Sequence, residues 1–338
     1  YRFKAWEEYG RVLSNTATYS FNINRNRYLT AVFEPLPSPG NERGFDFNGD
    51  GRADLMVQGL ENRDVLLGFM DGLELAGGGL LTTLPQGWEI KARGYFGGSS
   101  GLVLRHDKEE QIFLAMVDGL EITGVELIGS VPHEFRLMHA ADMNGDGSWD
   151  LVFMHEENRD VYTVYLEGFA PVDVQYLGRL EEGMDVVLPA DLTGNERSEL
   201  VLRHMQTGQM FMAETEAEGW ELTEIGTLPL KFDLAARGLF NQDYKADLLF
   251  QDQDTGQLWV VYMNGALAED VQDLGQLPLE EWKLMTVADY NGDGRSDTLW
   301  LHLPTRSLVV ALNGDNLFSQ AGILFELPED WQVVDNQK

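Results

Sequence analysis

The sequence contains no cysteine in its 338 residues, which excludes disulfide bonds and thiolate metal sites. Basic residues are scarce, with 24 Lys and Arg against 56 Asp and Glu, for a formal net charge of −32. Such a charge repels nucleic acid and anionic membrane surfaces, and it attracts cations. No run approaches the ~18 apolar residues of a spanning helix, so we expect no direct membrane insertion. The opening YRFKAWEEYG lacks the apolar core of a signal peptide, and without an initial Met we expect a piece of a longer protein.

Helical periodicity is also absent, and in its place a repeat of about 48 residues runs along the chain. Large apolar residues recur at intervals of 47, 49, 48, 50 and 49 residues, at Trp88, Phe135, Met184, Phe232, Trp282 and Trp331. A Leu-Pro or Val-Pro pair precedes most of them. A glycine follows the same period, at Gly72, Gly119, Gly168, Gly265 and Gly314. Because three markers share one period, the chain is built from structural repeats.

Each repeat is strand-like throughout. Short β-branched and aromatic runs lie between turn-forming residues, as in 135–143, 150–155, 161–166 and 174–179. Four short strands per repeat are typical of a β-propeller blade. A stacked solenoid is the competing architecture, but radial closure leaves fewer open sheet edges. The sequence therefore predicts an all-β propeller of four-stranded blades.

The number of blades depends on how the two ends of the chain are used. First-strand segments occur seven times if 38–47 and 331–338 are both counted, whereas the three following strands occur six times. We expect seven blades, with residues 1–37 supplying the missing strands from 1–8, 17–23 and 27–37. Six blades are the alternative, in which 1–37 form a separate small β-module and 38–338 form the propeller.

Three stretches of nine residues are nearly identical: DFNGDGRAD at 46–54, DMNGDGSWD at 142–150 and DYNGDGRSD at 289–297. Each carries side-chain oxygens at positions one, three, five and nine, and we expect the backbone carbonyl of position seven to complete the ligand set. Alternating oxygen ligands suit Ca²⁺, a hard cation that takes roughly six to eight oxygens. The candidate ligands are Asp46, Asn48, Asp50, Arg52 and Asp54; Asp142, Asn144, Asp146, Ser148 and Asp150; and Asp289, Asn291, Asp293, Arg295 and Asp297.

These loops differ from an EF-hand, which needs a bidentate Glu at position twelve. That position holds Val57, Phe153 or Trp300, each inside a predicted strand. The alternative is a metal-free turn rich in Asn, Asp and Gly. Because three carboxylates in an empty cluster would repel one another, we expect about three bound calcium ions.

The corresponding loops of the other repeats have lost part of the pattern. DLTGNERSE at 191–199 keeps oxygens at Asp191, Thr193, Asn195 and Glu199, which predicts a weaker metal site. In LFNQDYKAD at 239–247, Leu239 takes the first ligand position and Tyr244 replaces the glycine, and 96–101 has no carboxylate. A metal present on some blades and absent from others indicates a stabilising ion and not a catalytic one.

The D-x-N-G-D-G-x-x-D-L loops, the Thr-Gly-Gln turns at 207–209 and 255–257 and the Trp-x-Val-Val strand at 331–334 resemble the FG-GAP/VCBS repeat family. That family includes the integrin α-chain propeller and several fungal and bacterial lectins. The resemblance covers residues 38–338. It implies a calcium-bearing extracellular β-propeller used for binding or adhesion.

Two further groups of residues invite a functional reading. His106, His155, His204 and His302 recur in register at a strand end, with Gln58 and Gln251 expected at the same place in the other repeats. We favour a structural role, in which each satisfies the backbone of a neighbouring blade. Trp149 lies inside a calcium loop, where it either caps the neighbouring blade or, exposed, stacks on a ligand.

No phosphate loop, nucleophile elbow or HExxH motif is present. The sequence therefore predicts a secreted or cell-surface protein, bacterial in origin, that binds a glycan or an extracellular protein without catalysis. One alternative is a structural subunit of a surface appendage or filament, which predicts self-association. The other is a polysaccharide-cleaving enzyme, which would need a unique polar cluster that breaks the repeat.

Overall fold

The computed structural model describes residues 2–14, 19–21, 25–34, 45–106, 108–314, 318 and 320–335. Within these ranges the regular structure is β-strand, with no α-helix. Accordingly, the described residues include no helix long and apolar enough to cross a bilayer. The chain divides into two compact units, Tyr1–Pro39 and Gly40–Lys338.

The N-terminal unit is a three-stranded antiparallel sheet in the order β2-β1-β3. Its strands are β1 (Arg2–Glu8), β2 (Arg11–Ser14) and β3 (Thr30–Glu34). Tyr9 and Gly10, both with positive φ (53° and 77°), form the two-residue turn between β1 and β2. The expected strand over 17–23 is not found at the described residues 19–21, and the rest of that segment lies outside the described residues.

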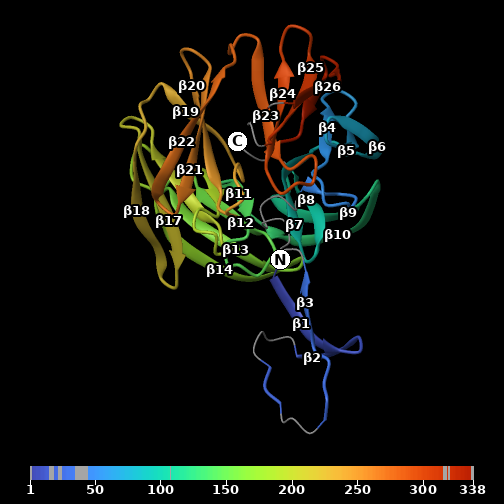
Figure 1. The fold of residues 1–338 in the computed structure, drawn as a ribbon. Helices are drawn as coiled ribbons and strands as arrows, with labels where there is room; N and C mark the ends of the chain where they lie inside the picture. Colours follow the sequence, from blue (N-terminus) through green and yellow to red (C-terminus); the bar gives the residue numbers. More distant parts are fainter. Residues whose placement is uncertain are drawn as a thin grey trace. The chain divides into compact units, whose positions relative to one another are not determined.

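The second unit contains six four-stranded antiparallel sheets (Figure 1). Sheet one is β27 (Trp331–Val333), β4 (Leu55–Gly59), β5 (Asp64–Asp71) and β6 (Glu74–Thr83). Sheet two is β7 (Trp88–Phe96), β8 (Ser99–His106), β9 (Gln111–Asp118) and β10 (Glu121–Ser130), and sheet three is β11 (Phe135–Ala141), β12 (Asp150–His155), β13 (Asp160–Glu167) and β14 (Ala170–Arg179). Sheet four is β15 (Met184–Ala190), β16 (Glu199–His204), β17 (Gln209–Glu216) and β18 (Gly219–Thr227). Sheet five is β19 (Phe232–Gly238), β20 (Asp247–Asp252), β21 (Gln257–Asn264) and β22 (Leu267–Gln276), and sheet six is β23 (Trp282–Ala288), β24 (Asp297–His302), β25 (Ser307–Leu312) and β26 (Gln320–Glu326).

The C-terminal strand closes the ring. In β27, Trp331, Gln332 and Val333 pair with Gly59, Gln58 and Val57 of β4, so the end of the chain supplies the first strand of blade one. The all-β propeller of four-stranded blades is confirmed, and the described propeller strands form six such blades. The seventh sheet of the described chain is the three-stranded one of the N-terminal unit, so the blade count is the six of the alternative. Residues 45–47 of the expected first strand are not in a strand, and 38–44 lie outside the described residues.

The recurring sequence markers have local structural reasons. The Pro132 carbonyl accepts a hydrogen bond from the Phe135 N–H (3.0 Å), and Pro229 does the same for Phe232 (2.9 Å). This turn places the large apolar residue at the start of the first strand of the next blade. The recurring glycine lies in the hairpin between third and fourth strands with a left-handed φ, for example 64° at Gly168, a conformation that favours glycine.

The core lies between blades. Each pair of neighbouring sheets encloses one cluster of buried apolar side chains, such as the cluster of Phe96, Trp149 and Leu166 between blades two and three. The corresponding cluster between blades six and one joins Leu55 and Leu299. The second strand of a blade is buried on both faces, as in β12, which explains its nearly continuous apolar sequence.

Candidate metal-binding loops

The three predicted loops occupy equivalent places in the propeller. Residues 142–150 connect β11 to β12, residues 289–297 connect β23 to β24, and residues 46–54 precede β4 in blade one. We number the nine residues of each loop from one to nine. The repeat therefore brings the three ligand sets to the same end of their respective blades, one set on each.

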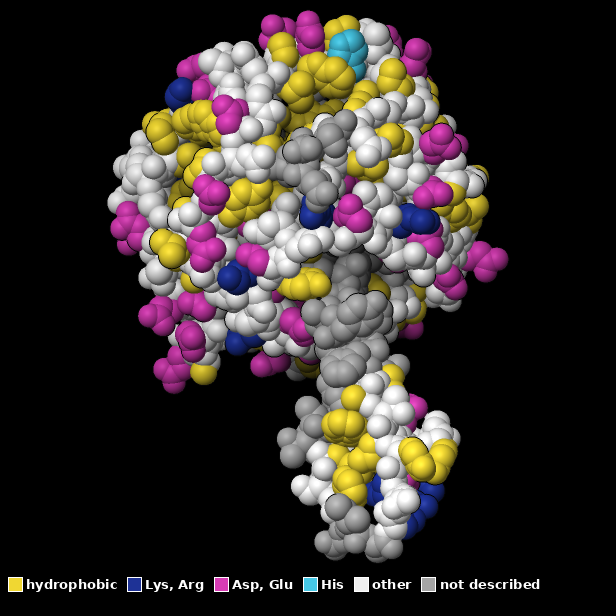
Figure 2. Space-filling view, in the orientation of Figure 1, with side chains coloured by type: hydrophobic (Ala, Val, Ile, Leu, Met, Phe, Trp, Pro, Cys, Tyr) yellow, Lys and Arg dark blue, Asp and Glu magenta, His cyan; other side chains and the backbone are white. Residues whose placement is uncertain are grey.

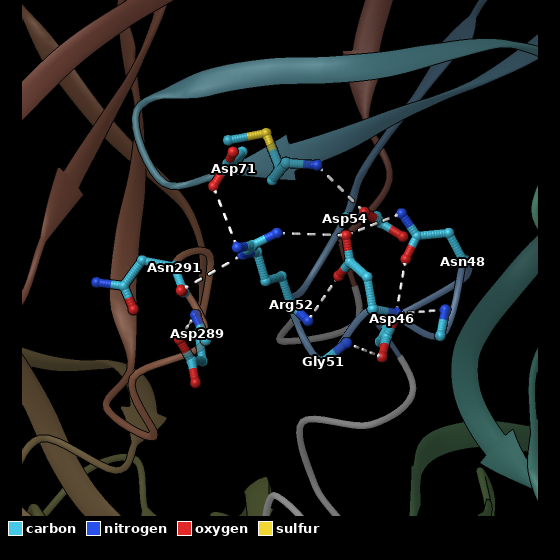
Figure 3. Close-up of polar contacts among 12 residues, drawn as sticks. Asp46, Asn48, Gly51, Arg52, Asp54, Asp71, Asp289 and Asn291 are labelled. Carbon is cyan, nitrogen blue, oxygen red and sulfur yellow. Dashed lines mark hydrogen bonds and ion pairs between the residues drawn. The ribbon is translucent and has the colours of Figure 1, made fainter.

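The first aspartate of each loop organises the turn, as Figure 3 shows for Asp46. Asp46 accepts hydrogen bonds from the backbone N–H groups of Gly49 (2.7 Å) and Gly51 (2.9 Å), one at each carboxylate oxygen. The same pair of bonds recurs at Asp142, from Gly145 (2.7 Å) and Gly147 (2.8 Å), and at Asp289, from Gly292 (2.7 Å) and Gly294 (2.8 Å). This carboxylate thus ties the fourth and sixth residues of the loop to the first.

Positions three and five form two successive Asx turns. The Asn48 side-chain oxygen accepts the Asp50 N–H (2.9 Å), and the Asp50 carboxylate accepts the Arg52 N–H (2.9 Å). The Arg52 guanidinium pairs with Asp50 of its own loop (3.6 Å). It also lies 3.3 Å from Asp71 and donates to the backbone carbonyl of Asn291 (3.4 Å), on the loop of the neighbouring blade (Figure 3). Position seven therefore contributes a contact between blades.

The carboxylate at position nine joins the loop to a distant strand. Asp54 accepts the N–H groups of Phe47 (2.8 Å) and Met70 (3.2 Å), and it is buried. Asp150 accepts those of Met143 (3.0 Å) and Leu166 (2.9 Å), and Asp297 those of Tyr290 (2.9 Å) and Asn313 (2.7 Å). We call this arrangement the position-nine staple. It satisfies two backbone groups that would otherwise be buried without partners.

Burial makes these carboxylates resist ionisation. It raises the pKa of Asp54 to about 7, and the pKa values of Asp150 and Asp297 to about 8, against the effect of their backbone N–H donors. Like charges add to the shift, since the carboxylates of Asp142 and Asp146 further raise the pKa of Asp150. Each loop therefore combines a buried carboxyl group at position nine with an exposed carboxylate at position five.

The donor set has the chemistry of a calcium site, because its oxygens are hard ligands. In blades one and six, however, the Oδ1 of the first aspartate accepts a second N–H, from position five (3.2 Å). The arrangement of these side chains is less suitable for a metal ion. Among the residues that the structure describes, no group of three or more His, Cys, Asp or Glu side chains is arranged so that it could hold a metal ion. Binding would require the side chains of a loop to move toward one another.

The altered loops keep much of the same scaffold. In blade four, Asp191 accepts the N–H groups of Gly194 (2.7 Å) and Glu196 (2.8 Å). Glu199 accepts the Leu192 N–H (2.8 Å) and the hydroxyl of Thr193 (3.0 Å), so this predicted ligand oxygen is already engaged. In blade five, Asp247 makes the complete position-nine staple, with Phe240 (3.1 Å) and Met263 (3.0 Å), although position one is a buried leucine.

The loops also connect neighbouring blades through a ring of backbone hydrogen bonds. The N–H at position eight donates to the carbonyl at position one of the preceding blade, from Ala53 to Asp289 (2.7 Å), Trp149 to Tyr95 (2.7 Å), Ser198 to Asp142 (2.7 Å), Ala246 to Asp191 (2.7 Å) and Ser296 to Leu239 (2.8 Å). At the remaining junction, the Ser100 hydroxyl donates to the carbonyl of Asp46. The sequence gives no sign of this ring, because backbone groups carry no sequence signal.

The recurring histidines are structural, as favoured. The His155 Nδ1 accepts the N–H groups of its own hairpin turn, at Glu157 (3.3 Å) and Asn158 (3.5 Å), and the ring packs edge-on against Phe135 (4.8 Å between centroids). The histidine thus serves its own blade and not a neighbouring one, which corrects the expectation. In blade three the histidine pairs with the first residue of the first strand, Phe135. The residues in that place in blades one and five are Gly59, which pairs with Trp331, and Asp252, which pairs with Phe232. The expected equivalents, Gln58 and Gln251, each lie one residue earlier.

Trp149 is not available to a ligand. Its side chain is 1% exposed and belongs to the cluster between blades two and three, where it meets the Phe45 ring edge-on. The tryptophan therefore caps the neighbouring blade, and the ligand-stacking alternative is wrong.

No family model matches the chain, and a search of curated proteins finds no relative. Solved structures with similarity include the Photorhabdus luminescens Tc holotoxin pore (16% identity, TM-score 0.49, covering 84% of this chain and 14% of that chain). They also include a Mycobacterium tuberculosis puromycin-hydrolyzing peptidase (13%, 0.44, 92% and 48%) and Citrobacter koseri AztD (10%, 0.43, 92% and 92%). These neighbours are β-propeller-like proteins that include an enzyme and a toxin. At such low identities and TM-scores, no activity or partner is transferred from them.

Proposed function

We propose that this protein is a calcium-binding β-propeller of the FG-GAP/VCBS type, which acts without catalysis as an extracellular ligand-binding or adhesion module. The observation that carries the calcium part is the repetition of one oxygen-rich loop at the same place on three blades. Each of these loops gathers several carboxylates close together, and in blade one Arg52 pairs with one of them, Asp50 (3.6 Å).

The charges around Asp150 illustrate this clustering. The charged groups that act on its pKa are Asp142 and Asp146, and both raise it. A divalent cation held by the loop would remove this repulsion and would be preferred to protonation at neutral pH. Asp142, Asn144, Asp146 and Asp150 would be the side-chain ligands in blade three, with equivalent sets in blades one and six. The ion would supply rigidity by fixing the turn.

The proposed binding role follows from the resemblance of the loops to the FG-GAP/VCBS repeats. Acidic side chains are spread over the face in Figure 2 and are not confined to the loops, as expected for a net charge of −32. The histidines whose rings pack on Phe135 and Trp282 are engaged in turns of the fold. A glycan or an extracellular protein, recognised across blade surfaces, is the partner class that we propose.

A ligand screen in two buffers tests this function. The wild-type chain and an Asp50→Asn/Asp146→Asn/Asp293→Asn variant are applied to arrays of glycans and extracellular proteins, in Ca²⁺ and in EGTA. We expect wild-type binding that requires Ca²⁺ and is reduced in the variant. Asp243→Asn is the matched control, because it changes the same position in a loop that lacks the first ligand.

The other outcomes are also informative. Absence of array binding together with concentration-dependent oligomers in analytical ultracentrifugation would favour a filament subunit and contradict the proposed role. Binding that is equal in Ca²⁺ and EGTA would retain the ligand-binding function and remove calcium from it.

A further inference from the structure

An apolar crevice opens between blades six and one, where the ring closes. It has a volume of about 570 Å³ and is lined on blade one by Leu55, Val57, Leu66 and Trp331, and on the facing side by Phe325 of β26 and Leu327 of the segment that joins β26 to β27. Its lining also includes the glycines of β6, and none of the described lining residues is charged. β26 of blade six and β6 of blade one contact each other beside it, and both lie at the upper right of Figure 1.

The crevice exists because blade one departs from the repeat. Val57 and Leu66 are directly paired across β4 and β5. The equivalent pairs in the other blades are Leu104–Phe113, Phe153–Tyr162, Leu202–Phe211, Phe250–Trp259 and Trp300–Val309. Each of those pairs contains at least one aromatic ring, and the blade-one pair contains none. The missing ring leaves space that the facing blade does not fill.

Glycines of β5 and β6 enlarge the crevice toward the last strand of blade one. Gly68 of β5 pairs with Gly78 of β6, whereas the corresponding residues of β14 and β22 are Val174 and Val271. Gly78 has a φ of +139°, and a Cβ there would lie 2.3 Å from the Leu67 carbonyl oxygen. The backbone at this position therefore requires glycine, and the crevice wall is bare peptide at this point.

The segment that joins β26 of blade six to β27 of blade one is held in place. The Arg306 guanidinium donates hydrogen bonds to the carbonyls of Leu327 (2.9 Å), Pro328 (2.9 Å) and Trp331 (3.1 Å). Three bonds from one planar group fix the segment that lines the crevice, so the space does not depend on a mobile loop. Preformed, largely apolar pockets of roughly 300–1,000 Å³ are typical of small-molecule sites.

We propose that this crevice binds an uncharged, largely hydrocarbon small molecule. The volume of the crevice limits the size of this molecule, and the described lining residues supply no cation to hold an anionic headgroup. The overall negative charge of the chain also disfavours an anionic ligand such as a fatty carboxylate. The inference is independent of the calcium loops, because no loop residue lines the crevice.

A fluorescence titration of the full chain tests the proposal, with N-phenyl-1-naphthylamine as the neutral apolar probe, in Ca²⁺ and again in EGTA. We expect saturable binding of one probe per chain, displaced by decanol at least tenfold more effectively than by decanoate. Leu66→Phe installs the residue that blades two and four carry, and Val57→Phe/Leu66→Tyr installs the blade-three pair. Either should weaken probe binding at least tenfold. Val125→Ser, which removes an exposed apolar side chain on β10, should leave binding unchanged.

Thermal unfolding accompanies each titration, since filling an apolar space with the ring used elsewhere in the repeat should keep or raise the melting temperature. Wild-type protein without saturable probe binding would overturn the proposal, because it would mean that another part of the chain or a second copy fills the crevice. Unchanged affinity in both filled variants would also overturn it. Equal displacement by decanol and decanoate would overturn the neutral-ligand part. Failure of calcium binding alone would leave the titration unaffected, so the two proposals fail separately.

Discussion

The loops of blades three and five show which parts of a calcium-type sequence the fold itself uses. Both contain an aspartate at position nine that accepts two backbone N–H groups, Asp150 from Met143 and Leu166, and Asp247 from Phe240 and Met263. Both also use position five in the same Asx turn. They differ at position one, which is Asp142 in blade three and a buried leucine in blade five.

The comparison separates two roles of one motif. The position-nine staple and the turn form without the complete ligand set, so they belong to the blade architecture. Relative to blade five, the complete loops add an acid at position one, which a cation would use as a ligand, and a glycine at position six. Blade four keeps the acid, as Asp191, but not the glycine. Calcium, on this account, stabilises a loop that is already folded.

The largest expected effect is a loss of stability when the position-nine staple, which both loops share, is removed. Asp150→Ala and Asp247→Ala each leave two buried N–H groups without partners, which should lower the unfolding free energy by about 2–4 kcal/mol. Urea unfolding in EGTA measures both. If only Asp150→Ala were destabilising, the staple would not be common to the two loops.

The next largest effect concerns calcium-dependent stabilisation, which we expect in blade three and not in blade five. Asp146→Asn and Asp243→Asn remove the same charge at position five, where Asp146 accepts the Ser148 N–H (2.7 Å) and Asp243 the Lys245 N–H (2.9 Å). A calcium site at 100 times its Kd adds about 2.7 kcal/mol of stability. We expect Asp146→Asn to lose about that much of the calcium-dependent stabilisation and Asp243→Asn to lose none. Equal losses in the two variants would contradict a blade-three site.

Blade five should acquire a site when its missing residues are restored. Leu239→Asp/Tyr244→Gly recreates positions one and six beside Asn241, Asp243 and Asp247, and should add one calcium equivalent. Tyr244 has a φ of 64°, so Tyr244→Gly alone should stabilise the chain by about 1 kcal/mol without changing calcium binding. Equilibrium dialysis with ⁴⁵Ca²⁺ and thermal unfolding distinguish the double from the single variant.

The smallest expected effect is a pH dependence in the calcium-free loop. Burial raises the pKa of Asp247 to about 7, from an ordinary value of 3.8. Between these values the unfolded carboxyl has lost its proton and the folded one retains it, so stability should fall as the pH rises toward 7. Urea unfolding across this range in saturating Ca²⁺ should show a shallower slope for Asp247→Asn than for the wild type. Identical slopes would mean that Asp247 is ionised throughout.

Much of the fold could be predicted from the sequence because its signals are local. The recurring Trp88, Phe135 and Phe232 indicated where the first strand of a blade begins, and the recurring glycine indicated the hairpin between its third and fourth strands. The blade count could not be obtained this way, since Trp331–Val333 pairs with a strand more than 270 residues earlier in the chain, as Trp331 with Gly59. Nothing in the local sequence of 331–338 distinguishes that partner from the strands of the N-terminal unit.

The loops were predictable as a ligand pattern but not as a scaffold. Spacing identified Asp46, Asp50 and Asp54, whereas their backbone partners became visible only with the pairing of strands. Trp149 was ambiguous because its burial depends on the neighbouring blade, which lies about one repeat away in sequence. The crevice beside Val57 and Leu66 was missed because it depends on the absence of an aromatic ring.

Isothermal titration calorimetry of Ca²⁺ into chelator-treated wild-type protein tests the central claim most directly. The account predicts about three equivalents, one for each complete loop, reduced by one in Asp146→Asn and unchanged in Asp243→Asn. Absence of binding heat, or a stoichiometry that is unaffected by Asp146→Asn, would show that the loops are metal-free turns and contradict the account.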